Sequence, residues 1–473
     1  MDGLTQRWLA DAPAVELAEL ALDAIGRHNG TINAILTPLP DRARADAEAC
    51  DAARRMGRRL GPLHGMPITL KDNIDFAGIR TTVGSDFYAD NIAGEDAELV
   101  GRLRRAGAVI VGKANLHEFA CGATSQSQRF SPCFNPWNLA HVPGGSSGGS
   151  GAGVASGMCV LSIGSDTGGS IRAPASFNGV AGLKPTNGAV PNRGSFPVSP
   201  PHDTLGPLAR RVEDLAACYM AMAGFDPADP TSEDRPVADA TTGLGAGVAG
   251  KTIGLPRTFF QDDLQPEVAE NTEAAIAVLS SLGVRVVEVE LPEAAEAWRI
   301  LSTVIVMADA AALHRDRMET ESQRMGRDVY DRIAVGRNVS GMQYAEALSF
   351  REHWRQGVAS LFHDGIDMLA MPTTPFTAPL ADPTANMGET SNRINRNNFP
   401  WSLAGVPALS LPSGFDASGL PTGLQLVGPR WHDAKLLVAG KAFQDASRLA
   451  SEGAAPRLTG KRDGQPFAAA TFF

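Results

Sequence analysis

The stretch Gly144-Gly145-Ser146-Ser147-Gly148-Gly149-Ser150-Gly151 (GGSSGGSG, residues 144–151) consists of glycine and serine alone. Such a run is typical of a flexible linker between separately folded units. Here it is followed directly by residues 152–185, an apolar segment that contains a strand-like run and a second Gly/Ser turn. Because a linker does not belong inside core-forming sequence, we interpret the run as part of a folded domain.

Three known glycine-rich or serine motifs fit this run poorly. A phosphate-binding GxxxxGK[ST] loop requires a lysine where Ser150 stands, and GxGxxG fails because Gly153 comes one position early. The nucleophile elbow GxSxG matches residues 144–148, but an elbow needs a buried strand before its serine. The preceding residues 134–143 (FNPWNLAHVP) are loop-like, and the nine histidines offer no obvious catalytic partner.

A second serine lies in a more suitable setting. Ser170 follows the apolar strand-like run 159–164 and the turn Thr-Gly-Gly in SIGSDTGGSIRAPAS (162–176). Glycines let successive backbone N–H groups point to one spot, which is the arrangement that stabilises a developing oxyanion. Two turns of small residues also pack closely, so we expect Ser146 to lie near Ser170.

A serine nucleophile needs a base, and the candidate is Lys71 at the end of the apolar run MPITLK (66–71). A free lysine has a pKa of about 10.4, so the group must be buried away from carboxylates to act near neutral pH. Two alternatives stay open at this point. A lysine at a strand end is usually solvated, and the adjacent Asp72 would raise its pKa by pairing with it.

The composition of the chain excludes several classes of function. The chain has 473 residues, of which 43% are hydrophobic and 20% charged, and a formal net charge of −10. The acidic balance argues against nucleic acid or an anionic membrane as partner, and no apolar run is long enough to span a bilayer. The N-terminus lacks a signal-peptide pattern. Five scattered cysteines show no metal-ligand spacing and fit a reducing cytoplasm.

Helix and strand patterns alternate along the chain, which favours an α/β fold with a large sheet covered by helices. The clearest unit is a βαβ pattern over 251–256, 266–283 and 284–292. Residues 385–401 are polar, rich in asparagine and long for a loop, so we expect a mobile lid there. Residues 226–250, rich in Pro, Asp and Gly, fit a linker or a surface loop equally well.

Together, three segments resemble the amidase signature family. They are GPLHGMPITLKDNID (61–75), NPWNLAHVPGGSSGGSGAGVASG (135–157) and SIGSDTGGSIRAPASFNGVAGLKPT (162–186), and their order and spacing match the family. The resemblance implies one α/β domain over residues 1–473, with a central twisted mixed β-sheet covered on both faces by helices. The signature core spans about 61–215, and about 300–400 is the variable substrate-pocket region.

The resemblance also implies a Ser–cis-Ser–Lys triad and no metal or organic cofactor. Ser170 would be the nucleophile, and Ser146, preceded by a cis peptide bond, would bridge it to Lys71. The chain would cleave C–N bonds of small amides through an acyl-enzyme, with ester or carbamate (urethane) hydrolysis also possible. The backbone N–H groups of Thr167, Gly168, Gly169 and Ser170 would line the oxyanion hole, and Ser147, Asp166 and Arg172 would support the serines.

The partner of this chemistry is predicted to be a small-molecule amide, ester or carbamate, and a homodimer is possible. The segments at 304–325 and 342–362 look like those of stand-alone bacterial amidases, so that role is preferred over the A subunit of a tRNA-dependent amidotransferase. A catalytically dead binding protein is disfavoured because all three triad positions are intact. Residues 119–134 are expected to wall the pocket, with Gly122, Ala123, Thr124 and Ser125 either near the substrate or ordinary loop residues.

Overall fold

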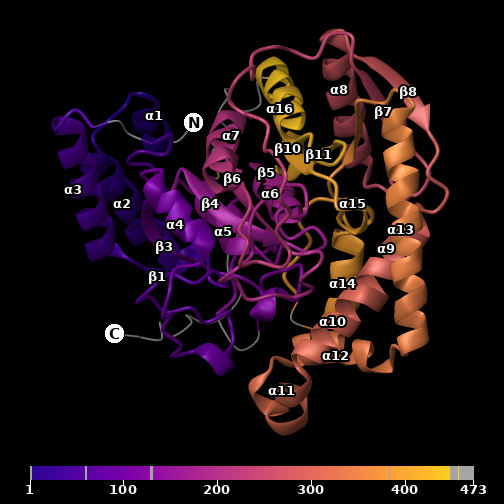
Figure 1. Ribbon diagram of the computed structural model, residues 1–473, viewed down its shortest axis with the longest axis horizontal. Helices are drawn as coiled ribbons and strands as arrows, with labels where there is room; N and C mark the ends of the chain where they lie inside the picture. The colour runs from indigo at the N-terminus through magenta and orange to yellow at the C-terminus, as the bar shows by residue number, and fades with distance from the viewer. Residues whose placement is uncertain (1–2, 59–60, 128–130, 383, 448–455, 457–473) are drawn as a thin grey trace.

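A mixed sheet of eleven strands organises the computed structural model, which describes residues 3–58, 61–127, 131–382, 384–447 and 456. The strand order is β1-β3-β2-β4-β6-β5-β10-β11-β9-β7-β8. The strands are β1 (Ile35–Pro38), β2 (Pro67–Lys71), β3 (Val109–Ala114), β4 (Leu161–Asp166), β5 (Ala181–Lys184), β6 (Thr204–Ala209), β7 (Thr252–Pro256), β8 (Arg285–Val289), β9 (Met368–Pro372), β10 (Ala408–Phe415) and β11 (Pro421–Val427). Figure 1 shows the sheet crossing the molecule from the N-terminal helices to β8.

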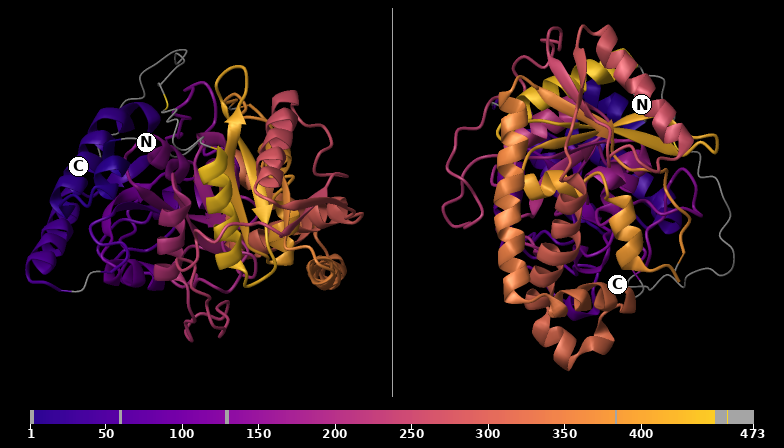
Figure 2. Two further views of the ribbon diagram at one scale, coloured as in Figure 1. Left: turned by 90° about the horizontal axis from the view of Figure 1, so that it is seen from above. Right: turned by 90° about the vertical axis from the view of Figure 1, so that its right-hand side faces the viewer.

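Helices cover both faces of the sheet, as Figure 2 shows. The α-helices are α1 (Gly3–Leu9), α2 (Ala14–Ile32), α3 (Pro40–Arg55), α4 (Glu98–Arg105), α5 (Gly148–Ala155), α6 (Arg172–Asn178), α7 (Val212–Met222), α8 (Pro266–Ser281), α9 (Ala294–Arg299), α10 (Val306–Leu313), α11 (Arg315–Thr320), α12 (Arg327–Ala334), α13 (Gly341–His363), α14 (Met387–Ile394), α15 (Phe399–Ala404) and α16 (Asp433–Ser447). A π-helical turn, η3 (Ile300–Ile305), joins α9 to α10. Short 3₁₀ turns are η1 (Asp86–Tyr88), η2 (Glu118–Ala120), η4 (Ser322–Arg324) and η5 (Val335–Asn338).

At β9 the sheet separates two hydrophobic clusters. Along β9, Met368 and Ala370 belong to the cluster under α8 and α16, whereas Leu369 and Met371 belong to the cluster formed with α10 and α13. Successive side chains of a strand point to opposite faces, so an unbroken apolar run is what a strand between two helical layers requires. The predicted α/β fold with a helix-covered mixed sheet is therefore confirmed.

The βαβ prediction is confirmed as well, since β7 and β8 are parallel neighbours joined through α8. In the described residues, no helix is both long and apolar enough to cross a membrane.

The prediction of a long loop at 385–401 is wrong. The segment forms α14 and the start of α15, and Asn397 and Asn398 between them are fully buried. Their side-chain amides donate to backbone carbonyls: Asn397 Nδ2 to Phe260 and Pro372, and Asn398 Nδ2 to Thr373. Asparagine thus serves here as an internal connector that pairs buried backbone groups, and its frequency in the segment does not indicate a solvated loop.

Candidate active site

Lys71 lies at the carboxyl end of β2, and its side chain is fully buried. Its Nζ donates to Ser146 Oγ at 2.7 Å and to Ser165 Oγ at 2.8 Å. Because β2 and β4 are parallel neighbours, the ends of both strands meet at one edge of the sheet, and this brings Ser165 beside the amine. The expected pairing of Lys71 with Ser146 is present, and the contact with Ser165 was not predicted from the sequence.

Burial lowers the pKa of Lys71 to about 7, and the charges of Asp166 and Asp203 oppose this only in part. The alternative in which Asp72 pairs with Lys71 is wrong. Asp72 Oδ1 lies 3.0 Å from Lys113 Nζ, and Asp72 Oδ2 accepts from the Thr82 N–H at 2.9 Å. The nearest carboxylate in sequence is thus occupied by a lysine of β3, so the Lys71 amine has hydroxyl partners.

Ser146 stands in a tight turn just before α5, and the peptide bond between Gly145 and Ser146 is cis. A Cβ on Gly145 would lie 2.7 Å from the backbone carbon of Ala123, so only glycine fits this close approach. Ser147 fixes the turn to its neighbours. Its hydroxyl donates to the Ser165 carbonyl at 3.1 Å, and its N–H donates to the Ser170 carbonyl at 3.2 Å.

Ser170 ends the loop that follows β4 and lines a narrow cavity of about 30 Å³. Within the part of the chain that the structure describes, no hydrogen bond joins its hydroxyl to Ser146. The structure therefore brings the three predicted residues into one neighbourhood and forms the Lys71–Ser146 link. The Ser146–Ser170 link is not formed in the described residues.

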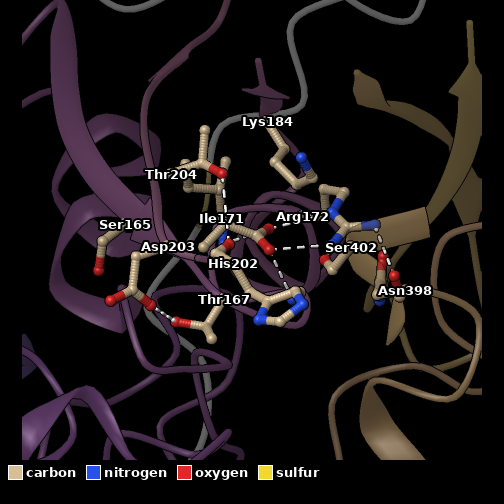
Figure 3. Close-up of polar contacts among 12 residues, drawn as sticks. Ser165, Thr167, Ile171, Arg172, Lys184, His202, Asp203, Thr204, Asn398 and Ser402 are labelled. Carbon is tan, nitrogen blue, oxygen red and sulfur yellow. Dashed lines mark hydrogen bonds and ion pairs between the residues drawn. The ribbon is translucent and has the colours of Figure 1, made fainter. Parts of the chain in front are cut away.

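Asp166 and Arg172 form a buried clamp behind the Ser170 loop. Burial would raise the pKa of Asp166, but the Arg172 guanidinium, together with Lys184 and the Ile171 N–H, outweighs it and the pKa is lowered. Arg172 donates to Asp166 through Nε and Nη2, at 3.0 and 2.9 Å. It also donates to Ser402 Oγ at 2.7 Å and to the Asn398 carbonyl at 3.1 Å, which ties the loop to α15 (Figure 3). These contacts place Asp166 and Arg172 behind the Ser170 loop, and their supporting roles stay a prediction.

Gly169 does not fit its predicted place in the oxyanion hole. Its N–H donates to Asp166 Oδ1 at 2.7 Å, so the amide turns toward the clamp and away from the cavity. Its φ of +133° is one that L side chains rarely adopt, and a Cβ there would lie 2.2 Å from Asn395 Oδ1. Thr167 and Gly168 line the cavity with Ser170, and the Thr167 hydroxyl donates to Asp203 Oδ1 at 2.5 Å (Figure 3).

The four residues expected near the substrate separate into different environments. Gly122 lines the cavity of Ser170, whereas Thr124 lines a larger cavity of about 670 Å³ on the other side of α14. Ala123 is buried, and its N–H donates to Ser391 Oγ at 3.0 Å. Ser125 accepts from the Gly148 N–H at 3.1 Å and so supports the Ser146 turn. Residues 128–130 of the predicted wall lie outside the described residues.

Sequence reasoning missed Arg332, which lines the cavity of Ser170 from α12. Arg332 is 8% exposed, and its Nε has no hydrogen-bond partner among the described residues. Its Nη1 makes only long contacts, 3.4 Å, with the carbonyls of Met387 and Gly388. A single arginine in an amphipathic helical pattern looks like a solvated residue, so only the packing of α12 against the site reveals it.

The described residues contain no group of three or more His, Cys, Asp or Glu side chains arranged to hold a metal ion. The groups that the site presents are hydroxyls, the Lys71 amine, backbone amides and the Arg332 guanidinium.

Comparisons with known proteins identify the family that the chain resembles. The family model described as Amidase matches residues 16–437. The A subunit of a Glutamyl-tRNA(Gln) amidotransferase from Moorella thermoacetica is 40% identical over 454 residues, which cover 91% of this chain and 93% of that protein.

Two solved structures are similar over nearly their whole length. One, described as a vestigial protein complex that reveals the evolutionary origins of an s-triazine catabolic enzyme, has a TM-score of 0.88 at 36% identity, and the match covers 93% of this chain and 97% of that one. The other, described as an amidase, has a TM-score of 0.82 at 31% identity and covers 94% and 99%.

Proposed function

The chain belongs to the amidase family, and from this premise we propose that it cleaves carboxamide C–N bonds through an acyl-enzyme on Ser170. The observation that supports this most directly is the buried Lys71 amine, hydrogen-bonded to Ser146 beside the cavity that Ser170 lines. With a pKa of about 7, a large share of this amine is neutral near neutral pH and able to accept a proton.

In the proposed relay, neutral Lys71 takes a proton from Ser146 while Ser146 takes one from Ser170. The Ser170 oxygen attacks the amide carbon, and the tetrahedral oxyanion is stabilised by backbone N–H groups of residues 167, 168 and 170, which line the cavity. Protonated Lys71 then returns its proton through Ser146 to the leaving nitrogen. Water, deprotonated by the same relay, attacks the acyl-enzyme and releases the acid.

From the position of Arg332 we infer the substrate class: a carboxamide that also carries a carboxylate. A guanidinium with an unpartnered Nε beside the nucleophile is suited to hold an anionic group. The cavity of about 30 Å³ is close to the space of one water molecule. An acyl chain therefore enters only when the walls of this cavity on α12 and α14 shift.

A matched pair of amides tests this assignment. Glutaramate, the monoamide of glutaric acid, carries the carboxylate, whereas pentanamide has nearly the same length without it. We expect Arg332→Gln to lower kcat/KM for glutaramate about 10–100-fold, because charged hydrogen bonds contribute roughly 1.5–3 kcal/mol, and to change pentanamide little. Ser170→Ala abolishes turnover of both. An equal loss on both amides in Arg332→Gln would assign Arg332 a structural role only.

The second candidate function is that of an amidotransferase A subunit, which liberates ammonia from a carboxamide for use by a partner protein. It is favoured by the curated relative at 40% identity, whereas the solved structure described as an amidase, which fits a stand-alone enzyme, is 31% identical. Both roles require the same bond cleavage. The discriminating experiment measures ammonia release from glutamine and glutaramate by the purified chain alone. Rates far below those of ordinary enzymes, about 1–10³ s⁻¹, with an intact fluorophosphonate reaction at Ser170, favour the amidotransferase role.

A further inference from the structure

A second cavity, here called the rear cavity, lies behind the Ser170 loop. It has a volume of about 260 Å³ and is lined by His202, Asp203, Arg351, Arg355, Ser402 and Arg430 among others. None of its lining residues lines the cavity of Ser170. The two are nevertheless neighbours, because Asp203 accepts from Thr167 and Ser402 accepts from Arg172 (Figure 3).

Three arginines give the rear cavity a surplus of hydrogen-bond donors. Arg351 and Arg355 come from α13 and share one carboxylate, Glu352. Arg430 follows β11 and pairs with Glu233. Their side chains are 22%, 32% and 24% exposed, so each is held in place and still reaches solvent. Arg430 also donates to the carbonyls of Asn187 and Gly405. Each guanidinium has five N–H groups, so Arg351 and Arg355 in particular keep donors that their shared carboxylate does not engage.

The carboxylate of Asp203 does not neutralise these arginines. Its oxygens accept from the Thr167 hydroxyl and from the N–H groups of Val198 and Ser199, so it is committed to its own loop. Burial, together with the charges of Arg351, Lys184 and Arg355, lowers the pKa of His202 to about 3. The charges that act on His202 are thus positive, and the other carboxylate that lines the cavity, Glu233, is paired with Arg430.

The hydrogen bonds of His202 define which tautomer it holds. The Ser199 hydroxyl donates to Asp309 Oδ2 at 2.5 Å, and Tyr344 donates to Oδ1 of the same carboxylate at 2.7 Å. Ser199 Oγ is therefore the acceptor in its 3.0 Å contact with His202, and Nδ1 carries the proton. The other nitrogen, Nε2, is then a hydrogen-bond acceptor. His202 is 2% exposed, and Nε2 has no partner in the described chain.

A ligand that completes this site must bring oxygens for the guanidinium groups and one hydrogen-bond donor for Nε2. An ionised carboxylate or a sulfate has no such donor. A phosphate monoester has its second pKa near about 6 and keeps a P–OH group on part of its population near neutral pH. We propose that the rear cavity binds a protonated phosphate group, either as hydrogen phosphate or as the head of a phosphate monoester.

Sulfate provides the matched probe, because it has the shape of phosphate but lacks the P–OH donor. Titration calorimetry of the full chain at pH about 6.5 and constant ionic strength compares inorganic phosphate, methyl phosphate and sulfate. We expect either phosphate to bind at least about tenfold more tightly than sulfate, because only phosphate can donate the additional hydrogen bond to the buried Nε2 acceptor. Tighter binding of methyl phosphate identifies an ester as the natural ligand, and tighter binding of inorganic phosphate identifies the free anion.

Variants locate the binding. Arg351→Gln and Arg355→Gln should weaken phosphate at least about tenfold each, whereas Arg299→Gln, at an exposed pair with Glu296, leaves it unchanged. Arg332→Gln and Ser170→Ala should also leave it unchanged, which separates this site from the proposed catalytic cavity. Sulfate binding as tight as phosphate in the unaltered chain, no phosphate binding, or loss of binding only in Arg332→Gln would overturn the proposal. The sulfate comparison needs no variant and so holds even where a variant fails to fold.

Discussion

The pH dependence of Ser170 reactivity is the sharpest test of the proposed relay. The pKa of Lys71 is lowered from 10.5 to about 7 by burial. This shift of about 3.5 pH units corresponds to about 5 kcal/mol of lost preference for the charged amine. At pH 7 about half of the lysine is then neutral, compared with roughly 3 in 10⁴ at the ordinary value. Burial thus raises the concentration of the proposed base about 10³-fold.

A fluorophosphonate probe measures this without a known substrate. The second-order rate constant for labelling Ser170, followed from pH about 5.5 to 9.5, should rise about tenfold per unit below pH 7 and level off above it, as a single neutral base requires. Lys71→Ala should remove the dependence together with most of the rate. A constant that keeps rising to pH about 10 would refute a lowered lysine pKa.

Glu118 provides the matched control for this profile. Burial raises the pKa of Glu118 to about 7, although the Ser85 hydroxyl and the Gly326 N–H donate to its carboxylate. It therefore titrates in the same range near the same site. Glu118→Gln should preserve the midpoint near pH 7. If the variant lost the pH dependence, the titrating group would be Glu118 and the role proposed for Lys71 would be wrong.

Three further predictions concern Lys71 and the clamp. Because the folded pKa of Lys71 is below its unfolded value, the unfolded chain binds more protons between pH 7 and 10.5. Stability relative to Lys71→Met should therefore increase by about 1.4 kcal/mol per pH unit in that window, and urea unfolding at pH about 7 and 9 checks it; a constant difference contradicts the shift. Ser165→Ala removes one acceptor of the ammonium form and should move the midpoint of the labelling profile down by about 0.5–1 unit; an unchanged midpoint would make that contact irrelevant to the amine. Arg172→Met leaves the buried Asp166 without its counter-ion and should cost about 3–5 kcal/mol of unfolding free energy, against less than about 1 kcal/mol for Arg299→Met at an exposed pair. Similar losses in these two variants would show that the clamp adds no stability.

The elements whose residues follow a local sequence pattern could be predicted from the sequence. The strand runs, the βαβ unit and the two Gly/Ser turns follow from the order of apolar and small residues, which each segment carries within itself. The segment 385–401 shows where this approach stops. Its asparagines suggested a loop, yet Asn397 and Asn398 are buried because distant carbonyls accept their hydrogen bonds.

The sequence by itself determined which chemical groups are available: two serines in glycine-rich turns, and a lysine at the end of an apolar strand. Only the tertiary structure decided how far these groups are buried, which partners they have and, for the lysine, its pKa. β2 lies between β3 and β4, so Lys71 is fully buried, and Lys113 of β3 engages Asp72. The packing of α12 likewise brings Arg332 to Ser170. The physical reason is that a pKa and a charge partner depend on burial and on neighbours in space, which residues far apart in the chain provide only after folding.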